Sequence, residues 1–174
     1  MKFYQVPRFI FNPIASEGIC EGSCLLPTDW EGSLEKEIRV YGKDDITSNK
    51  IEANITDPDW WYANKGKVDW VIAITQGSEY TEWILDYGLD TANKGLCILD
   101  RITFLEPTRK REGFLDNSCL TNLKILSPRP AFRADGNQSK DSVTSAWFVF
   151  RKAGAARVNT KVDFEVGWDR PKRT

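Results

Sequence analysis

The distribution of hydrophobic and polar residues predicts short strands that alternate with helices. Six apolar runs of strand length end at glycine or polar residues. They are Arg8–Phe11, Ile38–Tyr41, Val68–Ile74, Gly95–Leu99, Leu123–Leu126 and Trp147–Phe150. Between the third and the fourth run the period becomes helical, because Tyr80, Trp83, Ile84 and Tyr87 fall on one face of a helix.

This order of elements predicts an α/β fold, a Rossmann-like doubly wound and mostly parallel sheet with an antiparallel edge strand. The run Gly95–Leu99 is almost wholly apolar, which is typical of a strand that both faces of a parallel sheet bury. The last two runs are joined by a polar loop and form the antiparallel edge. We expect one domain over residues 1–152 and a C-terminal extension over 153–174, ordered in part around Val162, Phe164 and Val166.

Length and composition favour a soluble globular protein. The chain has 174 residues, 41% of them apolar, which suffices for one hydrophobic core. No apolar run approaches the roughly 20 residues that cross a bilayer, and the first residues lack the apolar stretch of a signal peptide. We therefore expect a cytoplasmic protein without membrane contact.

The chain contains no histidine, which removes the commonest general base and the commonest metal ligand. Cys20 and Cys24 are separated by three residues in a glycine-containing segment, and Cys97 and Cys119 are far away in the sequence. This spacing is a poor match to a zinc site, so we expect no metal and reduced thiols.

Charge is unevenly distributed along the chain. Residues 1–100 carry seventeen acidic and nine basic side chains, whereas residues 101–174 carry eight acidic and fifteen basic ones. The basic second half is suited to contact with a polyanion such as nucleic acid. A set of solvated surface charges is the alternative. The residues that would contribute are Arg109, Lys110, Arg111, Arg129, Arg133, Arg151 and Lys152.

Several segments of the chain are similar to one enzyme family in order and spacing. They are Thr56–Trp61, Val68–Ile72, Lys94–Leu96, Phe104–Thr108, Ser127–Phe132, Asp135–Asn137 and Ser145–Phe150. With these segments the chain resembles the class I S-adenosylmethionine-dependent methyltransferases, in particular small adenine-specific DNA methyltransferases of phages and bacteria. The resemblance covers about residues 54–152 and is weaker over 8–53. It implies S-adenosylmethionine as cofactor and a nucleic-acid amine as substrate.

The family's catalytic motif is missing from the matching position. The resemblance implies Asn-Pro-Pro-Phe after the fourth strand of the family, and Ile74-Thr75-Gln76-Gly77 stands there instead. Acceptor, prolines and aromatic ring are all replaced, so Thr75 and Gln76 are the candidates to orient an amine. The segment Asp57-Pro58-Asp59-Trp60 is an alternative location for the motif, although it would put the following strand out of register.

The resemblance also implies cofactor contacts after the first two strands. After the first predicted strand, Asn12, Ala15, Glu17 and Gly18 match the family's outline of a polar residue, proline, small residues and a glycine turn. After the second, Asp45 is the candidate to hold the ribose hydroxyls. The helix that should follow the glycine turn is interrupted by Gly22, Pro27 and Gly32, which weakens the expected pocket.

Three classes of function follow from these observations. The first is a methyltransferase that acts on nucleic acid with Thr75 or Gln76 as substitute acceptor, and with Arg109, Lys110, Arg111, Arg129 and Arg133 on the phosphates. The second is a non-catalytic binding or regulatory module with the methyltransferase fold. The third, an unrelated α/β enzyme that uses Asp45, Asp57 or Asp59, lacks any phosphate-binding glycine loop to support it. Trp30, Trp60 and Trp61 are further candidates, to stack on a base.

Overall fold

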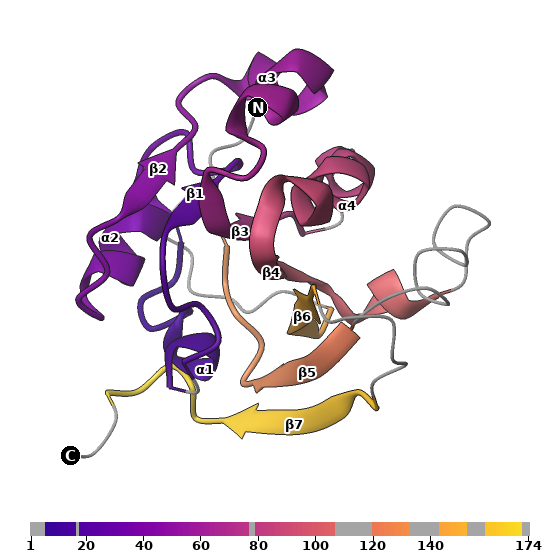
Figure 1. Ribbon diagram of the computed structural model, residues 1–174. Coiled ribbons are helices and arrows are strands. Elements are labelled where there is room, and N and C mark those ends of the chain that lie inside the picture. The colour runs from indigo at the N-terminus through magenta and orange to yellow at the C-terminus, as the bar shows by residue number, and fades with distance from the viewer. Residues whose placement is uncertain are drawn as a thin grey trace.

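The computed structural model describes residues 6–16, 18–76, 79–106, 120–132, 143–152 and 159–171. Its centre is a seven-stranded sheet in the order β2-β1-β3-β4-β6-β5-β7 (Figure 1). The strands are β1 Cys24–Leu26, β2 Ile46–Ser48, β3 Val68–Ile74, β4 Ala92–Arg101, β5 Leu120–Ser127, β6 Ser145–Arg151 and β7 Lys161–Val166. Every neighbouring pair is parallel except those that β6 makes with β4 and β5.

Helices cover both faces of this sheet. They are α1 Asn12–Ala15, α2 Ser33–Arg39, α3 Pro58–Asn64 and α4 Tyr80–Thr91, with short 3₁₀ helices η1 Glu52–Thr56 and η2 Ile102–Leu105. Apolar side chains of α1 and α2 pack on one face of the sheet, and those of η1, α3 and α4 pack on the other. Figure 1 shows this arrangement, with α1 and α2 separated by the sheet from α4.

The central strands divide their side chains between these two cores. Along β3, Trp70 and Ile72 face α1 and α2, whereas Val71 and Ala73 face α3 and α4. Because successive side chains of a strand point to opposite faces, such fully apolar strands belong inside a sheet that is covered twice. The predicted fold class is confirmed. The antiparallel strand β6 lies between β4 and β5, and β7 adds a further strand beyond them.

The first two predicted strands are wrong. Arg8–Phe11 leads into helix α1, and Phe9 has the left-handed backbone angle φ of 66° that no strand contains. Ile38 lies in the last turn of α2, where it packs on the core together with Leu34 four residues earlier. That spacing is helical. The true first strands are only three residues long and lie further along the chain, in β1 and β2.

The second half follows the prediction more closely. The predicted helix around Tyr80–Tyr87 is α4, and the predicted strands Val68–Ile74, Gly95–Leu99, Leu123–Leu126 and Trp147–Phe150 lie within β3, β4, β5 and β6. Residues 161–166, which the sequence placed in a C-terminal extension, form β7 and pair with β5 along its length.

Candidate functional site

The parallel strands β2, β1, β3 and β4 end at the same edge of the sheet. In doubly wound folds this carboxyl edge carries the ligand site. Here it is formed by three segments: the loop from Pro27 to Gly32 after β1, the residues around Asn49 after β2, and Thr75 with Gln76 after β3.

Asp29 occupies the amino end of helix α2, in the loop after β1. The residue is 3% exposed, and its Oδ1 and Oδ2 accept hydrogen bonds from the backbone N–H groups of Leu34 at 2.9 Å and Glu35 at 2.8 Å. These N–H groups are among the donors that the first turn of a helix leaves unpaired. The positive end of this helix is therefore neutralised by a carboxylate of the chain itself.

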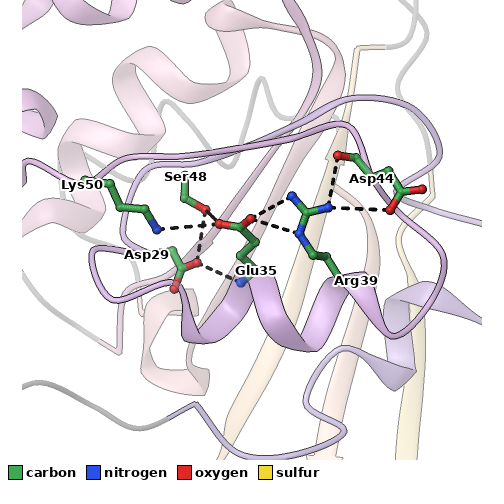
Figure 2. Close-up of polar contacts among 6 residues, drawn as sticks. All are labelled: Asp29, Glu35, Arg39, Asp44, Ser48 and Lys50. Carbon is green, nitrogen blue, oxygen red and sulfur yellow. Dashed lines mark hydrogen bonds and ion pairs between the residues drawn. The ribbon is translucent and has the colours of Figure 1, made fainter.

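A polar network extends from Asp29 across the same edge (Figure 2). The Ser48 hydroxyl, at the end of β2, donates to Glu35 Oε2 at 2.7 Å and lies 3.4 Å from Asp29 Oδ2. Arg39 donates to Glu35 Oε1 at 2.8 Å, and Lys50 Nζ lies 3.7 Å from Glu35 Oε2. The hydrogen bonds from Ser48 and then from Arg39 hold the pKa of Glu35 below its usual value of 4.5.

Trp30 fills the next position of the same loop with a large side chain. Its ring meets that of Tyr80 edge to face, with centroids 6.0 Å apart, and packs against the core under α3 and α4. The Tyr80 hydroxyl donates a short hydrogen bond to Glu52 Oε1. That bond, with burial, raises the pKa of Tyr80 to about 12. Within the described part of the chain, the buried ring nitrogen of Trp30 has no hydrogen-bond partner.

Asn49 and Thr28 tie the ends of the strands together. The buried Asn49 donates from Nδ2 to the carbonyl of Pro27 at 3.0 Å, and its Oδ1 accepts from the backbone N–H of Ile51 at 3.0 Å. The Thr28 hydroxyl accepts from the backbone N–H of Ile74 at 3.1 Å. The polar groups at the ends of β1, β2 and β3 are thus largely engaged with one another.

Thr75 and Gln76 follow β3 and are both buried. The Thr75 hydroxyl donates to Asp100 Oδ2 at 2.7 Å, and Thr81 donates to the same oxygen at 3.1 Å. Gln76 adopts the left-handed backbone angle φ of 48°, and its Oε1 accepts from the Ser145 hydroxyl at 3.4 Å. Its amide nitrogen is buried and has no hydrogen-bond partner among the described residues. The two predicted catalytic residues lie at the predicted edge, with their oxygens turned to neighbouring side chains.

The residues predicted to follow the first strand lie elsewhere. Asn12 begins helix α1; its Nδ2 donates to the carbonyls of Trp168 and Arg170, and its Oδ1 accepts a short bond from the Tyr41 hydroxyl. Ala15 ends the same helix, and Gly18 follows it. Glu17 lies outside the described residues. The predicted cofactor turn rested on a strand at Arg8–Phe11, and a helix against one face of the sheet takes that place.

Asp45 precedes β2 instead of following it, because the second strand begins at Ile46. It is exposed, and it lines a shallow cavity of about 500 Å³ together with Glu21, Tyr41 and Asp69. These residues stand before β1, β2 and near the start of β3. Asp45 therefore lies at the amino edge of the sheet, opposite Thr75 and Gln76.

The predicted phosphate-binding residues are mostly outside the described part of the chain. Arg109, Lys110, Arg111 and Arg133 fall in segments that the structure does not describe. Arg129 is exposed just beyond β5, at the carboxyl edge. Arg151 ends β6 and Lys152 follows it; because β6 is antiparallel to β4, both lie at the amino edge. The guanidinium of Arg151 lies over the ring of Trp70, 5.6 Å from its centroid. The described basic residues thus belong to two different edges.

The tryptophans proposed to stack on a base are packed inside the molecule to different degrees. Trp61 is 1% exposed and donates from its ring nitrogen to the carbonyl of Ile55 at 2.8 Å. Trp60 packs on Trp61 with ring centroids 4.9 Å apart. The alternative motif that begins at Asp57 starts helix α3, where the Asp57 side chain accepts from the backbone N–H of Asp59.

No metal centre is found among the described residues, where no group of three or more acidic, cysteine or histidine side chains is arranged to hold an ion. Cys20, Cys24 and Cys97 are free and buried. Burial raises the pKa of the Cys24 thiol to about 12 and that of Cys20 well above its usual value. Within the same residues, no helix has the length and apolarity that crossing a bilayer requires.

The sequence analysis missed Asp29 and Asp100, and it named Trp30 only as a residue that could stack on a base. The outline of proline, small residue and glycine is present after β1 as Pro27, Thr28 and Gly32, but a strand of three residues gives no detectable alternation before it. Asp100 follows the apolar run of β4, and an acidic residue at the end of a buried strand could have been recognised from the sequence.

Comparison with known proteins identifies the fold. No protein-family model and no curated protein sequence matches the chain. Among solved structures, a Listeria monocytogenes protein described as a class I S-adenosylmethionine-dependent methyltransferase superposes with a TM-score of 0.57 at 13% identity, over 90% of this chain and 63% of that one. A modification subunit of a type I restriction enzyme from Vibrio vulnificus gives 0.56 at 13% identity, over 92% and 45%.

The M protein of the type I restriction enzyme EcoKI gives a TM-score of 0.51 at 13% identity, over 87% of this chain and 45% of that protein. The chain thus spans less than two thirds of the first structure and less than half of the other two. At this identity the likeness concerns the fold. The fold is that of class I S-adenosylmethionine-dependent methyltransferases, as the sequence resemblance predicted.

Proposed function

We propose that this methyltransferase-fold protein does not bind S-adenosylmethionine and acts as a non-catalytic binding module. The observation that carries the proposal is the loop after β1, where Asp29 and Trp30 occupy the place of the cofactor turn. Fold alone would not decide between an enzyme and a module, because one fold supports many functions. The residues at the carboxyl edge favour the module.

The loop after β1 does not fit the cofactor. The family resemblance implies small residues and a glycine turn, which let the backbone approach the methionine part of the cofactor. Here the Asp29 carboxylate already accepts from the N–H groups of Leu34 and Glu35, so an anionic group would meet a negative charge there. The indole of Trp30 takes the next position and packs on Tyr80.

The end of β2 does not fit the ribose. The resemblance implies an acid with free oxygens after the second strand. Asn49 follows β2 here, and both ends of its amide are used by neighbouring backbone groups. The first acid further along the chain is Glu52, whose Oε1 accepts from the Tyr80 hydroxyl. That carboxylate is thus already bonded to Tyr80 through one of its oxygens, and it stands four residues beyond the end of β2.

The end of β3 does not fit a target amine. An exocyclic amine needs a free acceptor oxygen, and transfer depends on holding its nitrogen in line with the methyl group. The Thr75 hydroxyl donates to Asp100 and Gln76 Oε1 accepts from Ser145, so the oxygens of both buried side chains are turned toward these partners. The prolines and the aromatic ring of the family motif are replaced as well. No methyl transfer follows from this arrangement.

An active methyltransferase is the competing function, with Thr75 and Gln76 as its acceptors. It would require Trp30 to leave Tyr80 and Asp29 to leave the helix end before the cofactor could enter. These contacts stabilise the folded chain and oppose such a rearrangement. The titration with S-adenosylmethionine described below separates the two functions.

Nucleic acid is the partner that we propose for the module. Residues 101–174 carry fifteen basic against eight acidic side chains, and Arg129 is exposed at the carboxyl edge. Two of the similar structures are named as parts of type I restriction enzymes. Contact through phosphates requires no cofactor pocket. The proposal is therefore compatible with a carboxyl edge whose polar groups bond to one another.

Calorimetric titration with S-adenosylmethionine and with S-adenosylhomocysteine tests the loss of cofactor binding. We expect no heat and no thermal stabilisation up to millimolar ligand. A purified methyltransferase that binds S-adenosylmethionine under the same conditions serves as the positive control. Saturable binding at micromolar affinity would overturn the proposal and return the chain to the class of candidate enzymes.

Fluorescence anisotropy with labelled duplex DNA over a series of salt concentrations tests the partner. We expect binding whose affinity falls with salt. Replacement of Arg109, Lys110 and Arg111 by alanine should flatten that dependence, because each lost phosphate contact reduces the slope by about one. Replacement of Lys36, Lys65 and Lys67, which lie in the acidic half, is the matched control. An unaltered slope in the first variant would reject the basic cluster as the contact.

A further inference from the structure

Strand β7 carries a row of exposed apolar side chains at one margin of the sheet. Val162 is 52%, Phe164 71% and Val166 80% exposed, although all three belong to a regular strand. Among the described residues β7 pairs with β5 alone, and in Figure 1 it forms the outer strand of the sheet. Free edges with exposed apolar residues are templates for further strand pairing, and soluble proteins usually protect them.

The charged residues of β7 point to its other face. Asp163 and Glu165 alternate with the apolar row, and both contact Lys124 of β5, whose Nζ lies 3.5 Å and 2.9 Å from them. Lys161 also contacts Asp163, at 3.3 Å. These ion pairs therefore attach β7 to β5. The face of β7 that carries the apolar row has no charged side chain from the same strand.

The free edge also presents backbone groups that can pair. The N–H group of Gly167 donates to the carbonyl of Ser127, next to the end of β5. Because alternate residues of a strand direct their N–H and C=O groups to the same side, Lys161, Asp163 and Glu165 direct theirs toward β5. Those of Val162 and Phe164 are directed away from β5, to the open edge.

We propose that β7 pairs antiparallel with β7 of a second copy of the chain, with Lys161 of each copy opposite Glu165 of the other. In this register Val162 of each copy also lies opposite Phe164 of the other. The two Asp163 residues lie opposite each other at the twofold axis. Such an interface is isologous, since the same strand serves both copies. It joins the two sheets into one and covers part of both apolar rows.

Charge and the length of strand overlap together select this register. A shift by two residues would place Phe164 opposite Phe164 and bring Asp163 opposite Glu165 twice, without any pair of opposite charge. The opposite displacement would place Lys161 opposite Asp163 twice, but it would align only residues 161–163 of the two strands and leave Phe164 beyond the overlap. The proposed register aligns residues 161–165 and contains two pairs of opposite charge; its one like-charged pair is Asp163 opposite Asp163, and each of these carboxylates contacts Lys124 and Lys161 of its own copy. Opposite charges across strands stabilise pairing, whereas like charges weaken it.

Sedimentation velocity over a concentration series tests the proposal on the full chain. We expect a reversible monomer–dimer equilibrium for the wild type and a monomer for Phe164→Lys. Val40→Lys is the matched control, because Val40 is 75% exposed and lies after α2, far along the chain from β7. Circular dichroism and thermal unfolding establish that the variants are folded.

A second variant leaves the apolar row intact. Lys161→Glu should weaken dimerisation by about tenfold, because both pairs with Glu165 become repulsive. In the shifted register Lys161 faces Gly167, and the same variant would dimerise as the wild type does; that result overturns the register. A wild type that is monomeric up to millimolar concentration, or a Phe164→Lys dimer of wild-type affinity, overturns the interface itself.

Discussion

The Asp29 carboxylate lies 2.8 Å from the backbone nitrogen of Glu35 and closes the first turn of α2 from six residues upstream. It is the chain's own substitute for an external anion at this helix end. The same loop forms the carboxyl edge of the sheet after β1. A contact that stabilises the fold is therefore also the contact that argues against a cofactor there.

Replacing Asp29 by alanine should destabilise the protein by about 2 kcal/mol, because two backbone N–H groups lose their acceptor. Urea unfolding measures the free energy. Asp57→Ala is the control, since Asp57 is exposed and caps α3 through one hydrogen bond at 3.0 Å. We expect about 0.5–1 kcal/mol for this control. Equal losses in the two variants would contradict the importance of burial at Asp29.

Glu35 should make the protein less stable in acid. Its pKa in the folded chain lies below the value of 4.5 that it has when unfolded, chiefly through the hydrogen bond from Ser48. The stabilisation is therefore complete above the unfolded pKa and is lost as the pH falls through the folded one. In Glu35→Gln the free energy of unfolding should decline less between neutral and acidic pH. A wild-type decline in that variant would show that other carboxyl groups carry the acid sensitivity.

Tyr80 should ionise later than an ordinary tyrosine. The hydrogen bond to Glu52 raises its pKa from 10.0 to about 12, so its contribution to stability is present below pH 10 and is lost as the pH rises toward 12. Absorbance titration of tyrosinate should show a late step that Tyr80→Phe removes. The pKa of Tyr41 is also raised, by burial, so Tyr41→Phe is the control. A late step that survives in Tyr80→Phe would refute the assignment.

Lys124 should be essential for holding β7. It is fully buried between Asp163 and Glu165, and its removal would leave two partly buried carboxylates without it. We expect Lys124→Ala to cost about 3 kcal/mol and to speed amide exchange along β7. Lys161→Ala removes an exposed contact with the same Asp163 and should cost at most about 1 kcal/mol. If amide exchange in β7 were unchanged in Lys124→Ala, the contacts of Lys124 with Asp163 and Glu165 would have no role in holding the strand.

The sequence by itself determined most of the second half of the fold. The helical period of α4 and the apolar runs of β3, β4 and β6 are local patterns, and each predicts its element without knowledge of its neighbours. These elements were also sufficient to suggest the methyltransferase fold. Thr75 and Gln76 were placed at the carboxyl edge because β3 was predicted with its correct bounds.

Only the tertiary structure decided the first half and the state of the site. β1 and β2 have three residues each, too few for a pattern, and they become strands because β1 pairs with the edge of β3 and β2 pairs in turn with β1. The roles of Asp29, Trp30 and Glu52 depend on partners many positions away in the chain, in α2, α4 and β2. Sequence spacing reports periodicity, whereas the filling of a site depends on which distant side chains the packed sheet brings together.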